Sequence, residues 1–113
     1  MIRHTSDMQF TEVQMRGGNG LCKRLELLPQ AEMKHCRFMG CITIDKGNSI
    51  GAHDHVNETE YYWIVSGEGV VTEADGDKAV GPGDLVITGG GASHAIRNEK
   101  DEPLVFMAII ILD

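Results

Sequence analysis

Short alternating runs of hydrophobic and polar residues dominate the chain. In residues 37–46 (RFMGCITIDK), Phe38, Gly40, Ile42 and Ile44 fall on one face and the intervening residues on the other. A period of two is typical of a β-strand, because successive side chains of an extended chain point to opposite sides. We therefore predict a strand here with one face toward a core.

The rest of the chain repeats this pattern of strands and turns. Residues 1–20 are predicted to form an N-terminal arm with a short edge strand. Asp75-Gly76 separates two short runs and accepts the positive φ of a hairpin turn. Further strands are predicted over residues 21–28, 70–72, 77–80, 85–88, 93–98 and 104–112. No long helical period competes with them, so the pattern indicates an all-β sandwich or barrel.

The run at residues 104–112 (LVFMAIIIL) is apolar throughout. It is too short to cross a bilayer as a helix, which needs about 20 residues. We predict a strand that is buried on both faces, one of which lines the barrel interior. The other face needs a cover, and we expect a second subunit or an exchanged arm to provide it in a homodimer.

Residues 47–67 (GNSIGAHDHVNETEYYWIVSG) carry the candidate chemistry. His53 and His55 are two residues apart, so on a strand their imidazoles point to the same side. Glu60 can join them only if residues 56–59 turn the chain and a second strand begins near Glu60. Glu58 is a rival carboxylate, interpreted here as a solvated turn residue. By itself, a His-x-His pair on a strand is usually incidental.

Two blocks of the sequence closely resemble the two motifs of the cupins. The first block is matched by Gly47, His53, His55, Glu60 and Gly67. The second is matched by Gly83, Gly89, Gly90, Gly91, His94 and Asn98. One position departs from the family pattern, because Gly89 stands where a proline is usual.

The resemblance implies a small single-domain cupin over residues 1–113, an antiparallel β-barrel of the RmlC-like jelly-roll type with the barrel in 21–112. It also implies that one divalent metal is bound by His53, His55, Glu60 and His94. Three imidazoles and one carboxylate suit Mn, Fe, Ni, Zn, Co or Cu, and not Ca or Mg, which prefer oxygen ligands only.

Strand parity suggests which side chains surround that site. Tyr62 shares the face of Glu60 and is a candidate for proton transfer, with an ordinary core or rim tyrosine as the alternative. Phe38, Ile42, Ile64 and Ile96 are candidates for an apolar pocket lining, although the opposite face of the strand at residues 37–46 remains an alternative lining. The neighbours of Tyr62 in sequence have the opposite parity and are expected to pack outside the barrel.

Composition and charge narrow the class of partner. The formal net charge is −7 and the isoelectric point is about 5.1, and an acidic surface repels phosphate backbones and anionic lipids. We expect a small-molecule ligand and no nucleic-acid or membrane partner. Cys22, Cys36 and Cys41 cannot all pair within one chain, and the N-terminus lacks the apolar core of a signal peptide, so a cytoplasmic location is expected.

Two classes of function remain open. The first is a metal-dependent enzyme acting on a small oxygen-bearing molecule, with oxidoreductase or dioxygenase-like chemistry favoured over a sugar or uronate isomerase. The second is a non-catalytic module that binds or senses a small molecule. A purely structural role is the least favoured, because unpaired histidines and a carboxylate are costly to bury.

Overall fold

The computed structural model describes all 113 residues as ten β-strands and two single-turn helices. The helices are η1 (Thr5–Asp7) and η2 (Gln30–Glu32). The strands are β1 (Gln9–Val13), β2 (Cys22–Glu26), β3 (Cys36–Ile44), β4 (Ser49–Asp54), β5 (Glu58–Ser66), β6 (Gly69–Glu73), β7 (Gly76–Val80), β8 (Leu85–Gly89), β9 (Ser93–Arg97) and β10 (Leu104–Leu112).

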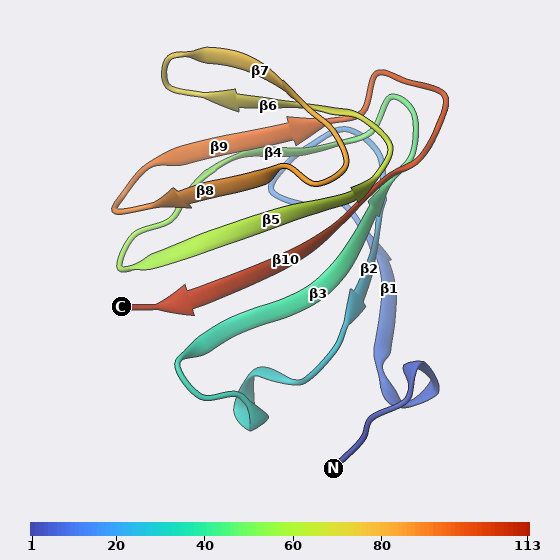
Figure 1. The fold of residues 1–113 in the computed structure, drawn as a ribbon, viewed down its shortest axis with the longest axis vertical. Helices are drawn as coiled ribbons and strands as arrows, with labels where there is room; N and C mark the ends of the chain where they lie inside the picture. Colours follow the sequence, from blue (N-terminus) through green and yellow to red (C-terminus); the bar gives the residue numbers. More distant parts are fainter.

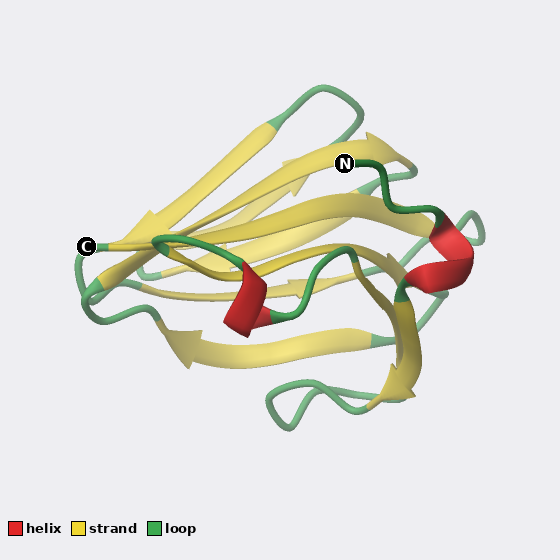
Figure 2. Cartoon of the chain, turned by 90° about the horizontal axis from the view of Figure 1, so that it is seen from below, coloured by secondary structure: helices red, strands yellow, loops and turns green.

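The strands form two antiparallel sheets. The six-stranded sheet has the order β1-β2-β3-β10-β5-β8, and the four-stranded sheet has the order β4-β9-β6-β7. Figure 1 shows β7, β6 and β9 above β5, β10 and β3, with the two helical turns at the lower end. Figure 2 shows the same strands from below and the helices, in red, outside the sheets. The predicted all-β jelly-roll architecture is confirmed, and the predicted edge strand of the N-terminal arm is β1. Neither helix is long or apolar enough to cross a membrane.

Side chains from both sheets meet in one hydrophobic core. The buried positions alternate along each long strand, as a two-layer β fold requires. The core residues are Cys22, Ile42, Ile44, Ile50, Tyr62, Ile64, Val71, Val86, Ile96, Leu104, Phe106 and Ala108. The inward face predicted for residues 37–46 is therefore correct, since Gly40, Ile42 and Ile44 are all buried in β3.

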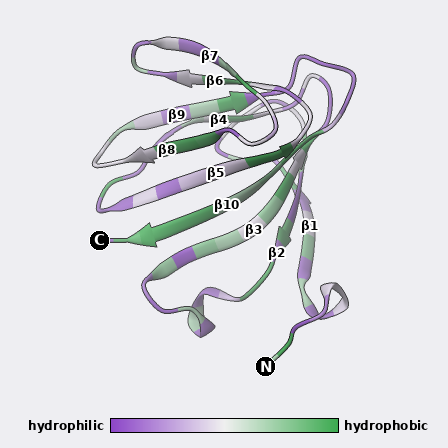
Figure 3. Ribbon diagram, viewed as in Figure 1, coloured by the Kyte–Doolittle hydropathy of each residue, from purple (hydrophilic) through white to green (hydrophobic).

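Within one chain, residues 104–112 are fully buried on one face only, and the predicted cover of the other face by a second subunit stays a prediction. Strand β10 is the most uniformly apolar strand in Figure 3, and it lies between β3 and β5. Its inward side chains are buried, but Met107 and Ile109 are only half-buried and Ile111 is 41% exposed. The outer face of this strand therefore has no full cover within one chain.

Gly67 holds the tight connection between β5 and β6. Its φ is +78°, a left-handed conformation that favours glycine. A Cβ atom added to Gly67 would press against the carbonyl oxygen of Pro103 and lie 2.9 Å from the Cα of Leu104. Gly47 also has a positive φ, but open space surrounds it, and Gly81 has neither constraint.

We predict that Gly67→Ala lowers the free energy of unfolding by about 2–4 kcal/mol, because it combines backbone strain with overpacking against the chain near Pro103. Gly47→Ala should cost only about 1 kcal/mol, from strain alone. Gly81→Ala is the matched control and should change the value by less than about 0.5 kcal/mol. Denaturant unfolding of the three variants measures this order, and equal midpoints for Gly67→Ala and Gly81→Ala would contradict it.

Candidate metal centre

The four residues singled out in the sequence come together between the two sheets. His53 lies on β4, His94 lies on β9 and Glu60 lies on β5, while His55 follows the end of β4. One ligand atom from each lies within 4.8 Å of the other three. His55 and His94 are each 1% exposed and Glu60 is 5% exposed, so the cluster is part of the interior.

Strand register brings these side chains to one point. His53 pairs with His94 across β4 and β9. The register between Ile50 and His53 shifts by one residue, because three steps along β4 correspond to two along β9. The resulting bulge lets Ile50 and His53 both face inward, although their odd spacing would place them on opposite faces of a regular strand.

The distances within the cluster suit a common ion. The Nε2 atom of His94 is 3.1 Å from that of His53 and 3.0 Å from that of His55. Glu60 Oε1 is 2.9 Å from His55 Nε2 and 3.0 Å from His94 Nε2. Two ligands at right angles on bonds of about 2.1 Å are about 3.0 Å apart. The observed separations therefore match neighbouring positions around one transition-metal ion.

The outer nitrogen of each imidazole is held by a different element. His53 Nδ1 lies 2.7 Å from the carbonyl oxygen of Gly51, and His55 Nδ1 lies 2.6 Å from Glu58 Oε2. A carbonyl oxygen and an ionised carboxylate can only accept, so both Nδ1 atoms donate. In a neutral imidazole, a donating Nδ1 leaves Nε2 with a free lone pair, and the Nε2 atoms of these two histidines point into the cluster.

His94 completes the donor set. Its Nδ1 is 2.9 Å from the hydroxyl of Thr88, which can donate or accept. Burial lowers the pKa of His94, which favours the neutral imidazole. With three neutral imidazoles and an ionised Glu60, the four inward-pointing atoms share at most one proton. One proton cannot satisfy four lone-pair donors, whereas a divalent cation can, so the donor chemistry fits a metal site.

Glu58 overturns a prediction made from the sequence. It is 8% exposed, lies at the start of β5 and is not a solvated turn residue. Its two oxygens accept hydrogen bonds from Arg37 Nε and Nη2 at 2.8 and 2.7 Å. Chiefly this pairing with Arg37 lowers the pKa of Glu58 to about 2. Strand alternation could have revealed the buried position of Glu58. Glu58 is two residues from Glu60, so on a strand both side chains point to the same face.

The electrostatics of the site keep Glu60 charged and Tyr62 neutral. Burial alone would raise the pKa of Glu60, but the surrounding imidazoles lower it to about 2. Burial first, and the charge of Glu60 second, raise the pKa of Tyr62 well above its ordinary value. The Tyr62 ring is stacked on that of His94 with 4.9 Å between centroids and 17° between planes. A phenol in this state can donate a hydrogen bond but cannot act as a base.

A cavity of about 240 Å³ opens beside the cluster. His53, His55, Glu60 and Tyr62 contribute to its wall. Of the predicted apolar lining, Phe38 and Ile42 face this cavity. Ile64 and Ile96 do not line it; they are fully buried in the hydrophobic core.

The fold and the cluster together define a class of protein: a jelly-roll β-barrel with three histidines and a glutamate converging in its interior. The family model described as "Cupin domain" matches residues 40–110. The chain therefore belongs to the cupin family, as the two motifs indicated.

Two matches from Thermotoga maritima, one of sequence and one of structure, cover most or all of the chain. The oxalate-binding protein of that organism is 37% identical over 99 residues, which are 87% of this chain and 82% of that protein. The crystal structure of a predicted oxalate decarboxylase from T. maritima is 34% identical, with a TM-score of 0.93 and 100% of both chains covered.

A more distant match comes from Acidithiobacillus ferrooxidans. The crystal structure of its putative sugar phosphate isomerase is 26% identical with a TM-score of 0.70. The match covers 80% of this chain but only 59% of that one.

We predict that Glu58→Gln weakens metal binding by about 10–100-fold, because the neutral amide no longer holds the Nδ1–H of His55 as a carboxylate does. Glu68→Gln, on an exposed carboxylate, is the matched control and should bind metal like the wild type. Competition with a chromophoric chelator measures both affinities. Equal affinities for wild type and Glu58→Gln would show that Glu58 does not support the site.

Proposed function

We propose that this protein is a metal-dependent cupin that binds a small carboxylate of the oxalate class, with His53, His55, Glu60 and His94 as the metal ligands. The observation that carries the proposal is the convergence of four inward-pointing ligand atoms, with the Nδ1 atoms of His53 and His55 held by acceptors on the outer side. The metal is one of Mn, Fe, Ni, Zn, Co or Cu, because these accept a mixed nitrogen and oxygen donor set.

The ligand class is supported by coordination and by charge. Four protein ligands leave two positions of an octahedron, which suits a ligand with two adjacent oxygens. Arg16 and Arg24 line the adjoining cavity and can donate hydrogen bonds to an anion. The sequence match and the structure match from T. maritima both carry oxalate in their names.

A reaction at this site would need a proton donor beside the ligand. Apart from the proposed metal ligands, Tyr62 and Glu26 are the groups in the cavity wall that can carry a transferable proton. A bound metal would polarise the ligand's oxygens and, if redox-active, would give access to oxygen chemistry. We propose Tyr62 as the hydrogen-bond donor to the ligand, since its neutral phenol lies against His94.

We predict that oxalate raises the melting temperature of the metal-loaded protein. At a concentration of 100 times its dissociation constant, a ligand stabilises the fold by about 2.7 kcal/mol, or roughly 10 °C for a chain of this size. His94→Ala should lose both the bound metal and the shift, while His4→Ala, an exposed histidine outside the cluster, should keep both. Metal analysis and thermal melts test this, and equal metal content in wild type and His94→Ala would remove His94 from the site.

The same samples separate an enzyme from a binder. Loss of oxalate in air but not under argon would support the oxygen chemistry expected from the sequence, and loss under argon would contradict it. Stabilisation without consumption would indicate a binding or sensory module. No response to oxalate together with a response to sugar phosphates would favour the isomerase alternative.

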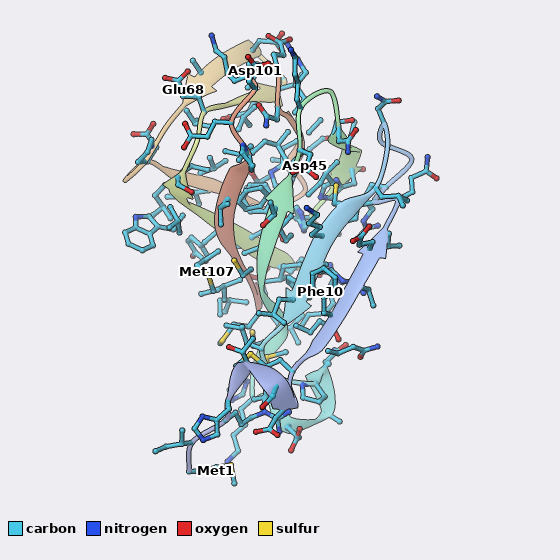
Figure 4. All side chains as sticks on the ribbon, turned by 90° about the vertical axis from the view of Figure 1, so that its right-hand side faces the viewer. Met1, Phe10, Asp45, Glu68, Asp101 and Met107 are labelled. Atoms are coloured by element: carbon cyan, nitrogen blue, oxygen red, sulfur yellow. The ribbon has the colours of Figure 1, made fainter.

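We further propose that the outer face of the six-stranded sheet binds a second copy of the chain. Paired residues of neighbouring strands share a face, and one apolar row crosses all six strands. The row consists of Phe10, Leu25, Cys41, Met107, Trp63 and Leu85. Phe10 and Met107 are labelled in Figure 4. Trp63 is 52% exposed and Leu85 is 53% exposed, and apolar surfaces of this kind mark contact sites.

We predict that light scattering at micromolar concentration gives twice the 12.4 kDa of one chain. Trp63→Lys should weaken association at least tenfold, because it would place an unpaired charge in the contact. Lys78→Ala, on the opposite sheet, should leave the mass unchanged. A monomeric wild type would contradict this arrangement.

A further inference from the structure

The cavity beside the metal centre is larger than oxalate requires. Its volume is about 240 Å³. Oxalate occupies the space of roughly three water molecules, about 90 Å³ in liquid terms. An oxalate-sized group at the metal would leave more than half of the cavity empty. The residues that line the remaining part therefore indicate which further groups the ligand carries.

Two of the three cavity arginines lack strong internal partners. Arg37 is committed, because its Nε and Nη2 atoms both donate to Glu58. Arg16 makes no side-chain hydrogen bond and no ion pair within the chain. The nearest acid to Arg24 is Glu26 at 3.7 Å, which is beyond hydrogen-bond distance. The guanidinium groups of Arg16 and Arg24 therefore have N–H donors at the cavity wall that no protein acceptor uses.

Arg24 lies near Glu26 but uses no side-chain N–H for a hydrogen bond within the chain. It pairs with Ile42 across β2 and β3, and its guanidinium lies over the ring of Phe38 at 5.7 Å from the centroid. Its Nε is buried with no hydrogen-bond partner. A cation–π contact of this kind attracts a guanidinium to the ring face without using its N–H donors. Arg24 is thus oriented by an aromatic ring while its Nη groups remain available for an acceptor.

Arg16 is held by its backbone. It has a φ of 55°, which is uncommon for a residue other than glycine. The preceding residue, Met15, accepts a hydrogen bond from the N–H of Gly51 at 3.1 Å. A Cβ atom on Gly51 would press against the carbonyl oxygen of Arg16, so these two segments of the backbone are in close contact. This fixes the backbone of Arg16 next to the β4 bulge that presents His53, while its side chain is exposed.

We infer that the ligand is a 2-hydroxy or 2-oxo dicarboxylic acid longer than oxalate, whose second carboxylate is bound by Arg24 and Arg16. This inference rests on the proposed binding of a carboxylate at the metal. The head of the ligand uses the two free coordination positions. The carbon chain lies along the apolar wall at Phe38 and Ile42, and the distal carboxylate meets the unused guanidinium donors. A planar guanidinium binds a carboxylate through two parallel hydrogen bonds, which gives selectivity as well as affinity.

Calorimetry under argon on the Mn-loaded protein tests this with matched acids. Malate and 2-hydroxyglutarate are compared with 2-hydroxybutyrate and 2-hydroxypentanoate, in which a methyl group replaces the distal carboxylate. Oxalate reports on the head alone. For the wild type we expect at least one of the two dicarboxylates to bind at least about tenfold more tightly than its methyl counterpart. Arg24→Gln should reduce that preference to less than about threefold, and Arg16→Gln should reduce it in part, because each variant should lose more affinity for the dicarboxylate than for oxalate.

Arg97→Gln is the control, since Arg97 lies on β9 away from the cavity and pairs with Asp77. It should retain the full preference for the dicarboxylate. Arg24→Lys keeps the charge but loses the planar fork, and should show an intermediate preference. Absence of any preference in the wild type overturns the inference, and so does an equal loss of oxalate and dicarboxylate affinity in Arg24→Gln. If none of the acids binds the metal-loaded protein, the proposed function fails instead.

Discussion

The structure depends on a group of lone pairs that face one another inside an apolar barrel. Unpaired polar atoms in such a setting are costly, so the surrounding chain orients each one, and a bound cation would satisfy the lone pairs that face inward. Three separate elements hold the imidazoles from behind: the Gly51 carbonyl in β4, Glu58 at the start of β5 and Thr88 in β8. The site is therefore built by both sheets and not by one loop.

Strand register is what makes this support possible. Glu60 pairs with Thr88 across β5 and β8, which brings the hydroxyl that contacts His94 beside the carboxylate. His53 pairs with His94 across β4 and β9. A slip of one residue in either pair would turn a ligand to the outer face. The metal site and the packing of the two sheets therefore depend on the same register, which links the stability of the fold to the geometry of the cluster.

Parity explains what the sequence could and could not predict. It correctly placed His53, His55 and Glu60 on the interior side, because inward direction depends only on alternation and on the turn between the strands. Strand parity could not predict how far along the barrel each inward side chain lies. Ile64 lies four residues beyond Glu60, about 13 Å along an extended strand, and so belongs to the core and not to the cavity. The role of Glu58 was missed because its partner Arg37 is 21 residues away in sequence and only the fold brings them together.

The outer face of β10 shows a second limit of prediction from the sequence. A uniformly apolar run predicts burial on both sides, yet the structure of one chain buries only one side fully. The sequence pattern indicates that the outer face of β10 needs a cover, but it does not indicate what provides that cover. Met107 and Trp63 pair across β10 and β5 in the row that crosses the sheet, so the uncovered surface is continuous and not a set of isolated side chains.

The charges around the cavity connect the metal to the ligand. With neutral histidines, the cavity and its supports hold equal numbers of positive and negative side chains, namely Arg16, Arg24, Arg37, Glu26, Glu58 and Glu60. These charges balance, so the protein groups alone give no net attraction for an anion. A divalent cation would add two positive charges in a low-dielectric interior, where they are poorly screened. A dianion would then restore neutrality, which favours a dicarboxylate over a monocarboxylate and makes ligand binding conditional on the metal.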